Sequence, residues 1–335
     1  GINADAIRQL ARDFAGAERA VWYGRIGTCA QTFGAITQWL FSLINIVTGN
    51  LDQPGGCMLN TPAVDLAQDP HIDPGRYNEW QSRVRGLPSF GGEIPASSFA
   101  EEMLTPGEGQ IRAFVCIAAN PVLSFPNGRK LDQAFESLEF MVALDPFITA
   151  SSRHADVILP AVPHVECDHY ELAFYSFAVR NVTKFIEPSI KASDAGMADW
   201  EILVALAERI AARKGISIEP TLSPAEMVDL ALQHGHYGEA AGHPAALSLE
   251  KLKTSPHGID LGPLQSRMPE CLQTDDHQIH CAPDVLVNDL ARLESDLFSS
   301  PKSDDLILIG RRHVRSKNTQ TQNCQRLMRG PNLCT

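Results

Sequence analysis

The sequence predicts an α/β fold built on parallel, doubly wound, Rossmann-like sheets with flanking helices. Three short apolar segments carry this prediction: Ala113–Ile117, Phe140–Leu144 and Val157–Leu159. They are rich in Val, Ile and Phe, and Asn, Asp or Pro follows each closely, which is typical of strands buried on both faces of a sheet. Residues 131–138 have apolar residues at helical spacing, so the order strand, helix, strand, short helix, strand indicates parallel pairing.

Polar residues stand where the first two predicted strands end. Asn120 and Pro121 follow the first strand, and Asp145 and Pro146 follow the second. In open α/β sheets, ligands bind beyond the carboxyl ends of the strands, where an acid can accept hydrogen bonds from a ribose or from the edge of a base. The alternative is that Asn120 and Asp145 only cap the helices that follow them.

The first fifty residues predict a helix, a strand, a turn and a second helix. Asn3 can cap the first helix, Gly16 ends it, residues 20–23 form the strand, and residues 33–47 form the second helix. The turn between them contains Gly24 and Gly27.

A glycine turn between a strand and a helix makes a cradle for a phosphate or a polar ring at the helix N-terminus. Gly24 and Gly27 do not form the dinucleotide-binding fingerprint, so an ordinary turn remains the alternative.

The middle of the chain is less regular. Residues 52–110 have little periodicity and many Pro and Gly, apart from a predicted short helix at residues 97–104. Residues 173–179 and 182–186 are predicted to be extended. Apolar spacing predicts a helix that begins at Asp199 and is ended by Gly215.

The last third predicts a helix at residues 225–234 among Gly- and Pro-rich turns, and a strand at residues 306–309. From Leu306 onward the chain has no acidic residue, but it has six basic ones: Arg311, Arg312, Arg315, Lys317, Arg326 and Arg329. This segment contains no aromatic residue, which favours a small anionic ligand over nucleic acid.

Length and composition allow two or three domains in the 335 residues, which carry a net charge of −12. The longest apolar stretch, residues 39–47, is too short to span a bilayer, so we expect no membrane insertion by this chain. None of the eight Cys forms a Cys-x-x-Cys pair, which fits reduced thiols and a cytoplasmic location. Because the chain starts at Gly1 without Met, we expect a fragment of a longer polypeptide.

Six motifs occur in one order: YGRIGTCAQTFG, TGNLDQPGG, AANPVLSFPN, ADVILPAVPHVE, MADWEIL and IGRRHVRSKN. Together they resemble the molybdopterin oxidoreductase family, of the dimethyl sulfoxide reductase, formate dehydrogenase and nitrate reductase type. The resemblance implies α/β domains that interleave along the chain and bind two molybdopterin guanine dinucleotides (bis-MGD) around one molybdenum atom.

The resemblance also implies which residues bind the cofactor. The positions that match the family's motifs are Gly24, Arg25, Gly27, Gln31, Asn120, Asp145, Asp199, Arg311, Arg312, His313 and Ser316. Among them, Asp199 resembles an acid that hydrogen-bonds guanine, and a carboxylate can accept both N–H groups of that base edge. The alternative for Asp199 is a helix cap. No catalytic residue and no metal ligand is assigned.

Some departures from the family's pattern carry consequences. The molybdenum ligand and the iron–sulfur Cys motif of such proteins lie upstream of the part matched here, so an iron–sulfur cluster is expected only there. Ala118 and Ala119 replace a frequent glycine, and Cys57 replaces another. The same pattern predicts four parts: the end of one α/β domain (residues 1–52), a second α/β domain (53–215), an irregular helical connection (216–300) and the truncated start of a β-rich molybdopterin dinucleotide-binding domain (301–335).

Three hypotheses for function follow. The first is part of a molybdenum-dependent oxidoreductase with two-electron chemistry, formate dehydrogenase- or nitrate reductase-like, with possible electron-transfer subunits as partners. Such a fragment is expected to be inactive in isolation. The second is a non-catalytic scaffold subunit of a respiratory complex that keeps the fold without molybdenum, and the third is an unrelated dinucleotide-binding oxidoreductase. The joint presence of Gln31, Asp145, Asp199 and Arg311 favours the first hypothesis.

Overall fold

The computed structural model describes residues 2–68, 76–191, 196–299, 306, 317–327 and 329. The chain forms two compact units, each assembled from separate stretches of sequence. The first unit comprises residues 1–68, 171–184 and 230–310, and the second comprises residues 69–170, 185–229 and 311–335. The four-part division into domains stays a prediction.

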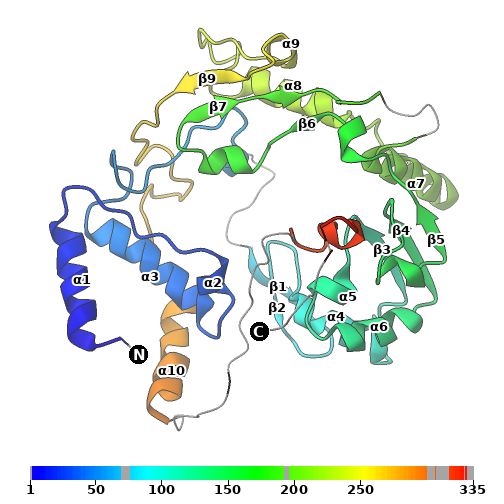
Figure 1. Cartoon of the computed structure of the whole chain (residues 1–335), viewed down its shortest axis with the longest axis horizontal. Coiled ribbons are helices and arrows are strands. Elements are labelled where there is room, and N and C mark those ends of the chain that lie inside the picture. The colour runs from blue at the N-terminus through cyan, green and yellow to red at the C-terminus, as the bar shows by residue number, and fades with distance from the viewer. Residues whose placement is uncertain are drawn as a thin grey trace. The chain divides into compact units, whose positions relative to one another are not determined.

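The second unit contains the predicted parallel sheet (Figure 1). Its strands are β3 (Ala113–Ile117), β4 (Phe140–Leu144) and β5 (Val157–Leu159), in the order β3-β4-β5. Both pairings are parallel, with Ala113 opposite Phe140 and Val142 opposite Val157. The three strands predicted from apolar runs are therefore confirmed.

Helices pack on both faces of this sheet, because alternate residues of a strand point to opposite faces. Met141 and Ala143 of β4 belong to a core with α4 (Phe99–Leu104) and α6 (Gly128–Glu136). Leu144, on the other face, packs with Ile202 of α7 (Asp199–Lys214). The doubly wound α/β architecture is confirmed in this unit.

The remaining elements are short or peripheral to that sheet. The other helices are α1 (Ala4–Gly16), α2 (Ile26–Cys29), α3 (Gly34–Val47), α5 (Pro121–Ser124), α8 (Pro224–His234), α9 (Leu249–Lys253) and α10 (Asp284–Ser299). The other strands form antiparallel pairs: β1 (Tyr77–Gln81) with β2 (Pro88–Phe90), β6 (His169–Tyr170) with β8 (Phe185–Ile186), and β7 (Asn181–Thr183) with β9 (Ile259–Gly262).

The first unit is held together by contacts between distant parts of the sequence. Trp39 Nε1 of α3 donates to the carbonyl of Cys281 (2.8 Å), and the Arg292 guanidinium of α10 lies 4.3 Å from the centre of the Phe33 ring. Helix α1 begins as predicted, with Asn3 Oδ1 accepting a hydrogen bond from Asp5 N (2.7 Å). These contacts place α3 beside α10, as Figure 1 shows.

The strand predicted at residues 20–23 is wrong. The segment pairs with side chains and not with a strand: Asn50 Oδ1 accepts from Ala20 N, Asn45 Oδ1 accepts from Trp22 N, and Asn45 Nδ2 donates to Trp22 O. Two Asn side chains thus satisfy backbone groups that a neighbouring strand would otherwise satisfy.

Three other segments were predicted to be extended or to form a strand: residues 173–179, 182–186 and 306–309. Residues 173–179 are not simply extended, because Phe174–Phe177 forms a 3₁₀ turn. The segment 182–186 is divided between β7 and β8, which belong to different sheets. The strand predicted at residues 306–309 lies outside the described residues except for Leu306.

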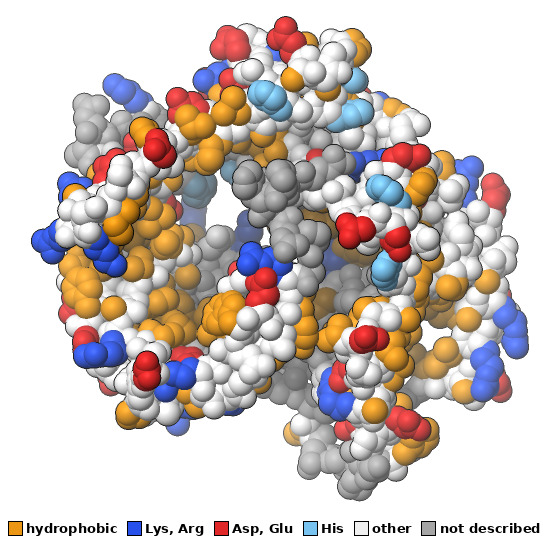
Figure 2. All heavy atoms as spheres, turned by 180° about the vertical axis from the view of Figure 1, so that it is seen from behind, with side chains coloured by type: hydrophobic (Ala, Val, Ile, Leu, Met, Phe, Trp, Pro, Cys, Tyr) orange, Lys and Arg blue, Asp and Glu red, His pale blue; other side chains and the backbone are white. Residues whose placement is uncertain are grey.

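Apolar side chains are exposed over several parts of the visible face (Figure 2). In α1, Ile7 and Leu10 remain 54% and 51% exposed, so the apolar stripe of this helix is not covered by the described residues. Among those residues, no helix combines the length and apolar character needed to cross a membrane.

Candidate cofactor-binding site

The carboxyl edge of the β3-β4-β5 sheet brings two predicted site residues to one place. Ala118 N, just beyond β3, donates to the carbonyl of Leu144 at the end of β4 (2.9 Å), so the loops that follow these strands leave the sheet together. Asn120 and Asp145 lie in these loops and are only 8% and 9% exposed. Two buried polar side chains therefore stand at the edge where α/β proteins bind ligands.

Asp145 shapes its own loop. Its Oδ1 accepts a hydrogen bond from Phe147 N (2.8 Å), two residues further on. Within the described part of the chain, Oδ2 has no hydrogen-bond partner. This hydrogen bond closes a turn within the loop and caps no helix, because the next helical element begins at Ser152; the second carboxylate oxygen is left available to a ligand.

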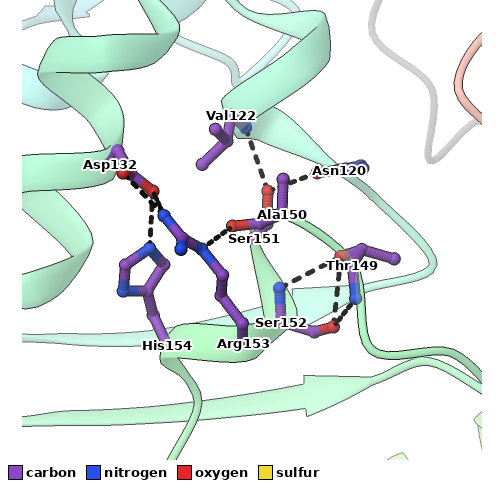
Figure 3. A network of polar contacts seen from close by, with 9 residues as sticks. All are labelled: Asn120, Val122, Asp132, Thr149, Ala150, Ser151, Ser152, Arg153 and His154. Atoms are coloured by element: carbon purple, nitrogen blue, oxygen red, sulfur yellow. Dashed lines mark hydrogen bonds and ion pairs between the residues drawn. The ribbon is translucent and has the colours of Figure 1, made fainter.

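Asn120 does not cap the helix that follows it. Helix α5 has no side-chain cap, and Asn120 Oδ1 instead accepts a hydrogen bond from Ser151 Oγ (2.7 Å; Figure 3). In the described residues, its amide nitrogen has no hydrogen-bond partner. The capping alternative therefore does not explain the side chain of Asn120.

The turn that carries Ser151 is anchored at both ends (Figure 3). Thr149 and Ser152 exchange hydrogen bonds between each other's backbone N–H and side-chain oxygen. Arg153 Nη2 and His154 Nε2 both contact the Asp132 carboxylate of α6, at 2.7 Å each. The hydrogen bond from Arg153, followed by that from His154, holds the pKa of the Asp132 carboxyl below its ordinary value.

Asp199 is the first residue of α7 but does not cap it. The N–H of Ala198, the residue before it, donates a hydrogen bond to Glu201 Oε2 (2.7 Å), and Asp199 makes no side-chain cap. Val162 N, shortly after β5, donates to the carbonyl of Met197 (3.1 Å), which places the start of α7 beyond the carboxyl end of β5. In this arrangement Glu201 performs the capping role that was the alternative for Asp199.

Two cysteines near this edge are poor nucleophiles. Burial raises the pKa of the Cys116 thiol to about 11, and Asp145 adds to the effect. Burial also raises the pKa of Cys167, and the charges of Asp168 and Asp199 raise it further. Both thiols therefore stay protonated near neutral pH, where the thiol is unreactive.

The predicted glycine turn belongs to the first unit. A Cβ atom on Gly24 would overlap the Phe41 ring, whereas one on Gly27 would meet nothing within 4 Å. Gln31 Nε2 donates to Thr28 O and Thr37 Oγ1, both at 3.1 Å. Packing thus accounts for Gly24, but it does not account for Gly27.

Arg25 of this turn lines a cavity of about 700 Å³ within the first unit. The Gly55-Gly56-Cys57 turn forms part of its wall. The other lining residues are Tyr23, Met58, Asn60, Phe174, Ser176, Phe177, Ala178, Val179 and Leu264. The sequence pointed to the two turns, through YGRIG and DQPGG, but not to the Phe174–Val179 side of the cavity.

The predicted site residues thus fall into three groups. Asn120, Asp145 and Asp199 lie in the second unit, and Gly24, Arg25, Gly27 and Gln31 lie in the first. Arg311, Arg312, His313 and Ser316 lie outside the described residues. In the part of the chain that is described, no group of three or more His, Cys, Asp or Glu is arranged to hold a metal ion.

Ala118 adopts a left-handed backbone conformation, with φ of 47°. This conformation costs a residue with a Cβ roughly 1–2 kcal/mol, and glycine avoids that cost. Ala118→Gly is therefore expected to raise the free energy of unfolding by about 0.5–1 kcal/mol, after allowance for glycine's greater freedom in the unfolded chain. Urea denaturation of the protein measures the change.

The neighbouring Ala119 is the matched control, because it is also exposed and does not have a positive φ. Ala119→Gly is expected to destabilise by about 0.5–1 kcal/mol. Changes of the same sign in both variants would contradict the argument from strain.

Comparison with known proteins identifies the family to which this chain belongs. The sequence profile of the molybdopterin oxidoreductase family matches residues 18–209, which is more than half of the chain. The chain therefore belongs to the molybdopterin oxidoreductase family.

Among curated proteins, the chain is similar to formate dehydrogenase subunits. It is 28% identical over 231 residues to the F420-dependent formate dehydrogenase 2 subunit alpha of Methanococcus maripaludis, covering 65% of this chain and 33% of that protein. It is 26% identical over 227 residues to the F420-dependent formate dehydrogenase subunit alpha of Methanocaldococcus jannaschii, covering 63% and 32%. The chain thus spans about a third of the length of these relatives.

Proposed function

We propose that this chain is part of a molybdenum-dependent oxidoreductase that binds molybdopterin guanine dinucleotide, and that its second unit holds the guanosine end of one such cofactor. The observation that supports this proposal is the set of polar residues at the carboxyl edge of the β3-β4-β5 sheet. There Asn120 and Asp145 are buried yet keep unused hydrogen-bonding atoms, and Asp199 is relieved of capping by Glu201. Neither of these unused atoms is among the fully buried unpaired side-chain atoms of the described residues, so a ligand can reach both of them.

The chemistry of these residues fits a guanine nucleotide. In the proposed arrangement, the Asp199 carboxylate accepts hydrogen bonds from the two N–H groups on one edge of guanine. Asp145 Oδ2 accepts from a ribose hydroxyl. The residues bind and orient the nucleotide, while the cofactor, when bound, supplies two-electron redox chemistry.

For the substrate, we propose formate, oxidised to carbon dioxide with release of one proton and two electrons. The support is the similarity to two proteins named as formate dehydrogenase alpha subunits. On the same basis we propose that the two electrons pass to a separate electron-transfer subunit, and that any iron–sulfur cluster belongs to sequence upstream of the matched part. A cytoplasmic location is also proposed, and the free thiols of the described cysteines are compatible with it.

The test of the guanine site is Asp199→Asn in the protein expressed from its complete gene, in a host that makes the cofactor. The variant replaces an acceptor that takes both guanine N–H groups by an amide that can take only one. Guanine nucleotide and molybdenum per protein are expected to fall at least about tenfold, since a hydrogen bond to a charged group contributes about 1.5–3 kcal/mol. Nucleotide released on denaturation and metal content are the measurements.

Glu201→Ala is the matched control on the same helix turn. It removes the cap on Ala198 N, so the melting temperature should fall while the nucleotide content stays at the wild-type level. An Asp199→Asn protein with full nucleotide content and only a lower melting temperature would refute the guanine role. A wild-type protein loaded with no molybdenum at all would favour the scaffold alternative.

A further inference from the structure

Ser151 is buried beneath the proposed nucleotide site and makes two hydrogen bonds. It is 0% exposed and lies in the anchored turn before β5. Its Oγ accepts from Val122 N (2.9 Å) and donates to Asn120 Oδ1 (2.7 Å) (Figure 3). The hydroxyl thus links the start of α5 to the Asn120 side chain.

The direction of this chain of hydrogen bonds follows from the donors available. Val122 N–H can only donate, so Ser151 Oγ must accept there and has one proton left to give. In the described residues, the Asn120 side chain offers the one acceptor within its reach. If the Asn120 amide were turned over, the buried Ser151 proton would have no acceptor, at a cost of about 1–3 kcal/mol.

The consequence concerns what Asn120 presents to a ligand. With Oδ1 held by Ser151, the amide nitrogen points away from the turn, as Figure 3 shows. Its N–H groups are donors, whereas Asp145 and Asp199 offer acceptors. The edge therefore combines one fixed donor with two carboxylates.

We propose that Ser151 is a positioning residue that fixes Asn120 as a hydrogen-bond donor to an acceptor oxygen of the bound nucleotide. This inference rests on the proposed function, because it deepens the same site. Ser151 itself does not touch the ligand. It acts by excluding the alternative orientation of the Asn120 amide, which would place Asn120 Oδ1, an acceptor, opposite the acceptor oxygen of the nucleotide.

The experiment measures guanine nucleotide per protein in the protein expressed from its complete gene, together with the melting temperature. Ser151→Ala is expected to lower the nucleotide content about three- to tenfold, the effect of one net hydrogen bond. Asn120→Ala should lower it at least as much. Adding Ser151→Ala to Asn120→Ala should lower it no further, since Ser151 acts through Asn120.

Ser152→Ala is the matched control. Ser152 is 1% exposed in the same turn, but its hydroxyl contacts Thr149 and Phe147 and not Asn120. This variant should lower the melting temperature and keep the nucleotide. Asn120→Asp tests polarity directly: it replaces the donor by a second acceptor and should lose more nucleotide than Asn120→Ala.

The outcomes test two claims separately: that Asn120 belongs to the nucleotide site, and that Ser151 positions Asn120. If Asn120→Ala keeps the full nucleotide content, the proposed site itself fails. If Asn120→Ala loses nucleotide but Ser151→Ala does not, or if Ser152→Ala loses as much as Ser151→Ala, Ser151 has only a structural role and the inference is overturned while the site stands. Full retention by Asn120→Asp would overturn the assigned donor.

Discussion

Asp52→Ala is expected to lower the free energy of unfolding of the first unit by about 3–5 kcal/mol. Asp52 is 3% exposed, and its Oδ2 accepts hydrogen bonds from Arg267 N (2.5 Å) and Met268 N (2.7 Å). The substitution removes both bonds and leaves two partly buried N–H groups unpaired. It also places Ala at a φ of 54°, a conformation that alanine adopts at a cost.

The measurement is urea denaturation followed by tryptophan fluorescence. Trp80 and Trp200 lie in the second unit and are partly exposed, so replacing both by Phe leaves Trp22 and Trp39 as reporters of the first unit. All variants are compared in this background.

Two further substitutions of Asp52 separate the causes. Asp52→Asn keeps an acceptor and tolerates the left-handed conformation, so it should be the mildest change. Asp52→Gly relieves the backbone but loses both hydrogen bonds, so it should lie between Asn and Ala. Equal stability of the Ala and wild-type proteins would show that the 266–268 segment is held by other contacts.

Gly24→Ala is expected to destabilise the first unit by about 1–3 kcal/mol, the usual cost of overpacking. The added Cβ would overlap the Phe41 ring, which already packs against Trp22 with 6.0 Å between ring centres. The ring must move or the turn must shift. The same fluorescence measurement reports this change directly, because Trp22 is the neighbour that Phe41 contacts.

Gly27→Ala is the paired variant, since its Cβ would enter open space within the short helix α2. It should leave the stability of the first unit within about 0.5 kcal/mol of wild type. Loss of bound nucleotide in Gly27→Ala without loss of stability would support a cofactor contact at this turn. Equal destabilisation by both variants would contradict the packing argument for Gly24.

The strands of the parallel sheet could be predicted to the residue from their apolar runs, but the expected burial on both faces is wrong for β3, where Val115 and Ile117 are 48% and 41% exposed. The three strands are short apolar runs, Ala113–Ile117, Phe140–Leu144 and Val157–Leu159. A segment with the apolar spacing of a helix separates the first two. The polar residues after two of these strands could be placed at one edge, because the carboxyl ends of parallel strands lie at the same edge of a sheet.

Other features depend on contacts that a local pattern does not contain. Residues 20–23 have the composition of a strand, yet the side chains of Asn45 and Asn50 take the backbone's hydrogen bonds. The role inferred for Ser151 depends on Asn120, which is 31 residues away in the sequence. The capping of α7 by Glu201 rather than Asp199 is a choice between two acids in the same turn, and either would satisfy the sequence pattern.

The discontinuous first unit also sets an order for folding during synthesis. Trp39 and Cys281 are 242 residues apart, and Asp52 and Arg267 are 215 apart. At 5–20 residues per second, the ribosome needs roughly 10–50 s to make the second partner after the first. During this interval, the sheet of the second unit can form from a continuous stretch, while α3 still lacks the contacts that it makes with Cys281 and α10. Helix α3 is therefore made long before the segment that packs against it in the first unit.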